Sequence, residues 1–181
     1  MIRGAAAGAA AAMLWSAAEF AAARALRHGF TDTRLLGRVA SERWWLPAGV
    51  LIHAFNGAAF GAAFAAAGAR GPMAGLRWAS AEAIATWPGM ALVDRVHPDR
   101  RSGRWPRPLL TDPRVIAQEA AMHALFGLAL GLLAPGGIAD GPRDAPARHQ
   151  RFGTSRTPFG TGAWRPLRLR FGSLGGSSSR R

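Results

Sequence analysis

Four mostly apolar stretches alternate along the chain with shorter segments that are rich in arginine. They cover about residues 4–26, 46–68, 72–96 and 113–134, and each approaches the roughly 20 apolar residues that a membrane-spanning helix needs. The second and fourth are the clearest, because residues 44–69 and 120–139 contain no Asp, Glu, Lys or Arg. The pattern predicts an all-α transmembrane four-helix bundle over residues 1–134, a multi-pass protein of the cell membrane.

Charged residues interrupt the other two stretches. Glu19 lies in the first, and Arg77, Glu82 and Asp94 lie in the third. A bundle of alanine-rich helices in water is therefore an alternative, although its long charge-free helices would need burial on every side. A second alternative makes the N-terminal stretch a signal peptide, because Arg3 precedes an alanine-rich segment.

The character of the chain changes after the fourth stretch. Residues 135–181 are rich in Pro, Gly, Ser, Thr and Arg, and the apolar periodicity is lost. Their only acidic residues are Asp140 and Asp144, against nine arginines. Such a composition buries too little apolar surface to fold, so we expect a disordered basic tail.

The net charge adds little about partners. All 23 basic side chains are arginines, and the formal charge is +13. Because abundant Arg, Ala, Gly and Pro indicate a GC-rich coding sequence, this charge predicts no specific nucleic-acid partner. The arginines between the stretches favour the cytoplasmic side for the first and third loops. We expect the lipid bilayer as partner, with anionic lipid contacts from the arginine-rich loops and tail, and a homo-oligomer.

The two halves of the chain share a pattern. Residues 15–19 and 78–82 both read Trp-x-x-x-Glu, and residues 53–61 and 123–131 both read His-x-x-x-Gly-x-x-x-Gly. The two motifs follow in the same order in each half. We interpret the chain as two duplicated helical hairpins that share one membrane orientation.

Ionisable residues inside apolar stretches need polar partners in a low-dielectric layer. At 1.5 Å per residue from the loop ends, Glu19 and His53 lie at similar depth. The count gives about fourteen residues for Glu82 and about ten for His123, and a kink at Pro88 would let the two meet. Glu119 lies one turn before His123 on the same face. We therefore predict intramembrane Glu–His pairs between neighbouring helices.

Glycines accompany both histidines. Gly57 and Gly61 follow one histidine at helical spacing, and Gly127 and Gly131 follow the other. Small residues four positions apart allow helix backbones to approach closely in lipid. We expect these four glycines to form the packing faces that bring each histidine to its acid.

Three functions agree with such pairs. The leading hypothesis is a non-enzymatic membrane or scaffold component whose Glu–His hydrogen bonds hold the bundle together. The alternative is a proton- or ion-coupled transport component. The third is a metal- or haem-binding protein with His53, His123, Glu19 and Glu82 as ligands, although the Glu-x-x-His spacing of di-iron bundles is absent. The sequence predicts no cofactor, and it contains no phosphate loop, dinucleotide fingerprint, Gly-x-Ser-x-Gly or His-Glu-x-x-His motif.

A weaker candidate is the basic loop VHPDRRSGRWP at residues 96–106. It contains His97 and Asp99, with Trp105 near its end. We interpret it as a loop that faces lipid headgroups, with Trp105 as an anchor at the membrane interface.

The motifs occur in a fixed succession over residues 4–134. Trp-x-x-x-Glu is followed by His-x-x-x-Gly-x-x-x-Gly, then by Trp87-Pro88 and by the second His-x-x-x-Gly. This succession resembles that of uncharacterised small four-helix integral membrane proteins of bacteria. The resemblance implies a fold without implying an activity or a catalytic residue.

Overall fold

The computed structural model describes residues 1–105 and 107–136 of the 181-residue chain. The tail predicted at 135–181 therefore lies, apart from its first two residues, outside the described residues. Within the described part every regular element is a helix, which confirms the all-α expectation. The helices are α1 (Ile2–Ala25), α2 (Asp32–Ala40), α3 (Trp45–Ala66), α4 (Pro72–Val96), α5 (Pro98–Arg101) and α6 (Pro113–Leu133).

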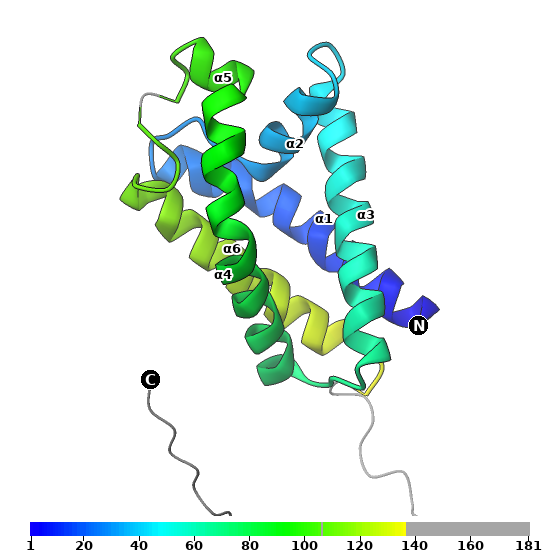
Figure 1. Cartoon of the computed structure of the whole chain (residues 1–181). Helices are drawn as coiled ribbons and strands as arrows, with labels where there is room; N and C mark the ends of the chain where they lie inside the picture. The colour runs from blue at the N-terminus through cyan, green and yellow to red at the C-terminus, as the bar shows by residue number, and fades with distance from the viewer. Residues whose placement is uncertain (106, 137–181) are drawn as a thin grey trace, which may run out of the picture. The chain divides into compact units, whose positions relative to one another are not determined.

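The long helices α1, α3, α4 and α6 correspond to the four apolar stretches (Figure 1). By length and composition, α1, α3 and α6 are apolar enough to cross a membrane. With 21 to 24 residues each, they extend over roughly 32–36 Å, against a hydrocarbon layer of about 30 Å. α4 is as long but carries Arg77, Glu82, Asp94 and Arg95, and it is not among these three.

Glycine faces bring α1 and α3 into direct backbone contact. A methyl group on Gly8 would overlap the carbonyl oxygen of Gly57 and lie 2.9 Å from the Cα of Gly61. A methyl group on Gly57 would in turn meet Gly8 and the side chain of Ala12. Only glycine therefore fits at this crossing, as expected for small residues at a helix interface.

A second glycine crossing joins α4 to α6. A methyl group on Gly75 would overlap the carbonyl oxygen of Gly127, and one on Gly131 would lie 2.7 Å from the Cα of Pro72. α1 also packs against α6 and so connects the two helix pairs. Their shared core is built around Trp15 and other buried apolar side chains, including Phe64, Phe126 and Leu130.

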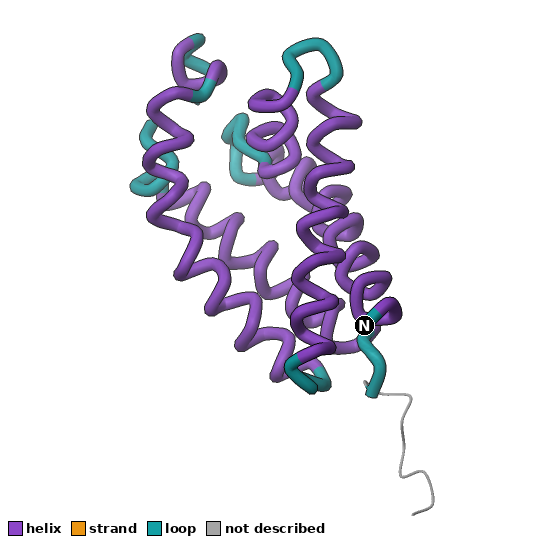
Figure 2. The backbone as a smooth tube through the Cα atoms, turned by 45° about the vertical axis from the view of Figure 1, so that its right-hand side comes forward, coloured by secondary structure: helices purple, strands orange, loops and turns teal. Residues whose placement is uncertain are grey.

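α2 is a short helix that the apolar pattern did not predict, and it folds back along α3. Thr31 is its N-cap residue, with a side chain that accepts the backbone N–H of Arg34. A methyl group on Gly37 of α2 would overlap the carbonyl oxygen of Trp45, so the two backbones touch. Figure 2 shows the loop between α3 and α4 at the opposite end of the long helices from the loop between α2 and α3.

Candidate functional site

A cavity of about 210 Å³ lies among α1, α2, α3, α4 and α6, and it collects most of the ionisable residues that the sequence pointed to. We call it the acid–histidine pocket. No arginine is among the described residues that line it. The ionisable lining residues are Asp32, His53, Glu82, Glu119 and His123, and the aromatic ones are Trp15, Phe60, Trp87 and Phe126.

Glu82 of α4 and His123 of α6 form a hydrogen bond across the two helices. The Nε2 atom of His123 lies 2.8 Å from the Oε2 atom of Glu82, and its Nδ1 atom lies 2.7 Å from the backbone carbonyl oxygen of Glu119. A carbonyl oxygen can only accept, so Nδ1 carries a proton. The Nε2 contact then joins either an imidazolium to a carboxylate or a neutral imidazole to a carboxylic acid. In both cases the pair shares one exchangeable proton.

Asp32, at the start of α2, brings a third carboxyl group into the pocket. Its carboxyl group lies near that of Glu119, and two neighbouring buried carboxyl groups avoid like-charge repulsion when one of them is protonated. Burial raises the pKa of Asp32 to about 6, although the nearby charge of His123 and the contact with Glu119 oppose this shift. The raised pKa makes the Asp32 carboxyl group a second site of proton exchange in the pocket.

Trp15 of α1 lies between the two histidine rings. Its ring centroid is 5.1 Å from that of His53 and 4.6 Å from that of His123. His53 is only 8% exposed, yet its Nδ1 atom has no hydrogen-bond partner among the described residues, and neither has the indole Nε1 of Trp15. Since buried polar atoms are normally paired, the missing partners distinguish these two atoms from a fully paired structural network.

Glu19 meets α2 rather than its predicted partner His53. Its carboxylate accepts the backbone N–H groups of Asp32, at 2.7 Å, and Thr33, at 3.0 Å, and its side chain is fully buried. A carboxylate at a helix N-terminus satisfies unpaired N–H groups and interacts favourably with the helix dipole. The expected Glu19–His53 pair is therefore replaced by a cap on a helix that the depth count did not include.

The four residues considered as metal or haem ligands are not gathered at one point. Glu19 caps α2, and Trp15 lies between His53 and His123. Within residues 1–105 and 107–136, no three His, Asp or Glu side chains are placed to hold a metal ion. The arrangement is suited to exchanging protons and to balancing a positive charge.

The pocket has a polar edge between α3 and α4. Asn56 of α3 and Thr86 of α4 line the pocket and are exposed. α1 packs against α3 and α4 packs against α6. In the described part of the chain, α3 and α4 meet through Phe60 and Phe64 against Trp78, about two turns of α4 away from Thr86. The edge between α3 and α4 therefore gives a ligand lateral access to the pocket.

The basic loop at residues 96–106 is a structural element of this fold. Asp99 is 1% exposed and pairs with Arg34 through two hydrogen bonds, of 2.5 Å from Nε and 3.0 Å from Nη2. Arg38 and Arg104 lie within 3.7 Å and 3.5 Å of the same carboxylate. Burial acts to raise the pKa of Asp99, but the hydrogen bond and charge of Arg34 and the charge of Arg38 hold it below its usual value.

His97 and Trp105 are buried inside this loop region instead of facing lipid headgroups. Their rings stack with centroids 4.2 Å apart, and Trp105 also packs edge-on against Phe30. His97 Nε2 lies 3.2 Å from the carbonyl oxygen of Leu35. Burial lowers the pKa of His97 more than this hydrogen bond and Asp99 raise it, so the ring is neutral at pH 7. The expected interface anchor Trp105 is thus a core residue.

Asp32 is the pocket residue that the sequence interpretation missed. A signal for it was present, because Thr31 followed by Asp32 is typical of a helix N-terminus. Leu35, Leu36 and Val39 then follow at spacings that place them on one helix face. That short pattern predicts α2, although it does not predict that α2 turns Asp32 toward Glu119.

The chain matches no protein-family model, no curated protein and no solved structure. The chemistry of the acid–histidine pocket therefore comes from its own residues. It combines three carboxyl groups, two imidazoles and aromatic walls.

Proposed function

We propose that the chain is a multi-pass integral membrane protein whose acid–histidine pocket binds a small organic cation together with protons. α1, α3, α4 and α6 form its four-helix bundle, of the kind found in the small bacterial membrane proteins that its motifs resemble. The proposal assigns the pocket to ligand binding, without a catalytic step. Its main support is one observation: three carboxyl groups and two imidazoles line a single cavity without any arginine among its described residues.

The outer faces of the helices support the membrane location. Large apolar side chains are strongly exposed on α3, including Leu51 at 69% and Phe55 at 73%, and on α4, including Ile84 at 77% and Leu92 at 68%. Contiguous exposed apolar surface of this kind favours a lipid surround over water. α4 directs Glu82 to the pocket while these apolar residues lie outside, so α4 fits as the fourth span despite its charges.

Equivalent contacts in the two hairpins support the proposed duplication. Ala12 and Gly75 each lie three positions before a motif tryptophan. Ala12 contacts Gly57, and Gly75 contacts Gly127, so each meets the first glycine of the following histidine motif. The second glycine of each motif contacts the preceding helix one turn further along. The halves differ because α2 lies between the two helices of the first half, and the start of α2 donates hydrogen bonds to Glu19, the acid of that half.

The charge of the pocket favours a cationic ligand over a purely structural role. A network that only held helices together would pair its own polar atoms, whereas the Nδ1 atom of His53, which can accept a hydrogen bond, has no partner in the described structure. Three carboxyl groups exceed two imidazoles, so either protons or a bound cation must balance the difference. Asp32, with its pKa raised to about 6, is the group that exchanges a proton near neutral pH.

The walls indicate an organic rather than an inorganic cation. Trp15, Phe60, Trp87 and Phe126 line the pocket, and aromatic faces attract alkylammonium groups through cation–π interactions. An inorganic ion would instead need several oxygen ligands at one point, and such a cluster is not found in the described residues. A small alkylammonium ion therefore fits the lining best.

The structural role is the second candidate, and one contact favours it specifically. The 2.8 Å bond between Glu82 and His123 joins α4 to α6 one to two helical turns from the glycine crossing. In this reading the protein is a scaffold component and the pocket needs no ligand.

Binding of tetramethylammonium to the detergent-purified protein separates the two candidates. Isothermal titration in two buffers of different ionisation enthalpy reports both affinity and proton release. We expect binding with release of a proton near pH 6–7, because the cation replaces the proton on the Asp32–Glu119 pair. Asp32→Asn and Glu82→Gln should weaken binding by about tenfold, the scale of one charged contact.

Glu42→Gln is the matched control, since Glu42 is an exposed acid remote from the pocket lining. It should bind as the unmodified chain does. If tetramethylammonium does not bind to folded protein, or binds equally to all variants, the cation-binding proposal is wrong. Lower thermal stability in Glu82→Gln without any cation binding would then favour the scaffold role.

A further inference from the structure

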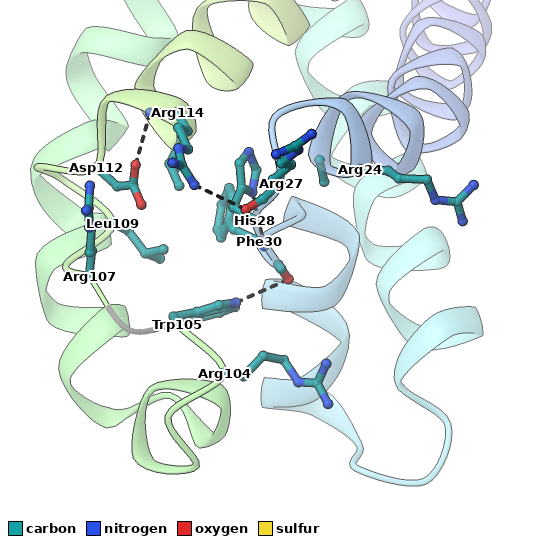
Figure 3. A pocket seen from close by; sticks show the side chains of 13 residues that line it. Arg24, Arg27, His28, Phe30, Arg104, Trp105, Arg107, Leu109, Asp112 and Arg114 are labelled. Atoms are coloured by element: carbon teal, nitrogen blue, oxygen red, sulfur yellow. Dashed lines mark hydrogen bonds between the residues drawn. The ribbon is translucent and has the colours of Figure 1, made fainter.

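A second cavity, of about 460 Å³, lies beside the C-terminal end of α1 and the N-terminal end of α6 (Figure 3). We call it the arginine pocket. Only one acidic residue, Asp112, is among the described residues of its lining. Its arginines are Arg24, Arg27, Arg104, Arg107 and Arg114.

Most of this positive charge has no acidic partner. Arg104 lies 3.5 Å from Asp99, whereas the other four guanidinium groups form no ion pair with any residue that the structure describes. The carboxylate of Asp112 is already engaged as the N-cap of α6, because it accepts the backbone N–H of Arg114 at 3.0 Å. The arginine pocket therefore has a clear excess of positive charge.

The inner wall of the arginine pocket is apolar and well packed. Phe30, Trp105, Leu109 and Val115 are each at most 3% exposed, and the indole of Trp105 donates to the carbonyl oxygen of Gly29 at 3.3 Å. Low-dielectric walls concentrate the field of the surrounding charges. An anion in this cavity is therefore attracted more strongly than one on an open, arginine-rich surface.

His28 adds a neutral donor to the same cavity. Its Nδ1 accepts the backbone N–H of Phe30 at 3.3 Å, so the neutral ring carries its proton on Nε2. Burial lowers the pKa of His28 more than the charge of Asp112 raises it. The Nε2 atom is buried and has no hydrogen-bond partner among the described residues. It is therefore available to donate to an anionic oxygen.

We propose that the arginine pocket binds a phosphate group, first of all the phosphate of an anionic lipid headgroup. Guanidinium groups match phosphate oxygens in both charge and geometry. The cavity lies at the ends of α1 and α6, two helices that are apolar enough to cross a membrane, and headgroups surround such helix ends. The same donors would also hold a soluble phosphate, so the experiment compares both sources.

The test measures binding to the full chain in a nonionic detergent. The probes are dioctanoyl phosphatidate and dioctanoyl phosphatidylcholine as lipids, and pyrophosphate as a soluble anion. The variant Arg27→Gln/Arg107→Gln removes two charges whose side chains make no hydrogen bond to the described residues. The control Arg43→Gln/Arg95→Gln removes two exposed charges outside the pocket lining, one just before α3 and one in the last turn of α4.

We expect the unmodified chain and the control to bind phosphatidate more tightly than phosphatidylcholine. The pocket variant should bind phosphatidate at least about tenfold more weakly, because charge-assisted hydrogen bonds are lost. Phosphatidate binding without pyrophosphate binding identifies a lipid ligand, and the reverse identifies a soluble phosphate. If neither probe binds, or if the control loses as much affinity as the pocket variant, the proposal is overturned.

Far-UV circular dichroism checks that the variants fold. If the double variant does not fold, the single variant Arg107→Gln replaces it. This outcome is independent of the cation-binding test.

Discussion

Replacing Gly8 with alanine adds one methyl group where α1 crosses α3. The new carbon would overlap the carbonyl oxygen of Gly57 and lie 2.9 Å from both the carbonyl carbon of Gly57 and the Cα of Gly61. Because these neighbours are backbone atoms, no side chain can rotate away to make room. The helices must therefore separate, or the crossing must shift.

The size of this effect follows from the distances. Ordinary carbon contacts begin near 3.4 Å, so the two 2.9 Å contacts require a separation of about 0.5 Å, and the overlap with oxygen requires more. A gap of about 0.5–1 Å removes a quarter to a half of the dispersion energy of each atom pair along the interface. Overpacking of this kind typically costs about 1–3 kcal/mol, and we expect that loss of unfolding free energy for Gly8→Ala.

Gly89→Ala is the matched control on α4. A methyl group on Gly89 would meet nothing within 4 Å, and alanine favours a helix over glycine by about 1 kcal/mol in water. We therefore expect no loss, or a small gain. Reversible unfolding in mixed micelles of a nonionic detergent and sodium dodecyl sulfate, followed by far-UV circular dichroism, measures both variants.

Two results would refute the reasoning. Gly8→Ala could unfold at the same detergent ratio as the unmodified chain, which would mean that α1 and α3 do not touch at Gly8. Alternatively, Gly89→Ala could lose as much stability as Gly8→Ala, and a loss at a position without close contacts would mean that close packing does not explain the effect at Gly8.

Three further predictions concern the polar groups. His123→Gln should lower the free energy of unfolding by about 1 kcal/mol, since it removes the 2.8 Å bond to Glu82. His53→Gln breaks no hydrogen bond to the described residues and should lose less. Equal losses in the same micelle assay would contradict this. Because the folded pKa of Asp99 is lowered, its stabilisation is present above the unfolded pKa of about 3.9 and is lost as pH falls through the folded value. The Asp99→Asn variant should therefore be less stable at pH 7. Its free energy of unfolding, measured from pH 7 to pH 3, should lack this acid-induced decrease. The folded pKa of His97 is also lowered. The free energy of unfolding should therefore fall as pH decreases below the unfolded pKa of about 6.5. A His97→Gln variant that kept this decrease would exclude His97 as its source.

The extents of the long helices could be predicted from the sequence because they depend on local composition. The four expected stretches differ from the observed ends of α1, α3, α4 and α6 by at most two residues. Pro72 and Pro113 begin two of these helices, where proline is favoured. The glycine spacing likewise indicated the faces on which helices meet, because residues four apart share one side of a helix.

The partners of the ionisable residues could not be predicted in the same way. Similar depth made both Glu19–His53 and Glu82–His123 plausible, yet only Glu82 reaches its histidine, because the N-terminus of α2 supplies Glu19 with two backbone donors. A count of residues along each helix contains no information about a third segment that competes for the same acid.

The sequence by itself thus determined the helical class, the long helices and their glycine faces, all of which depend on side chains within a few turns of one another. Tertiary structure alone decided that Asp32 joins Glu119 and His123 in one pocket, that Trp105 is buried against His97, and that five arginines from separate segments line one cavity. These arrangements depend on how α2 and the loop after α5 fold onto the long helices. Contacts between residues 60 or more positions apart, such as Arg34 with Asp99, set that folding, and no local pattern encodes them.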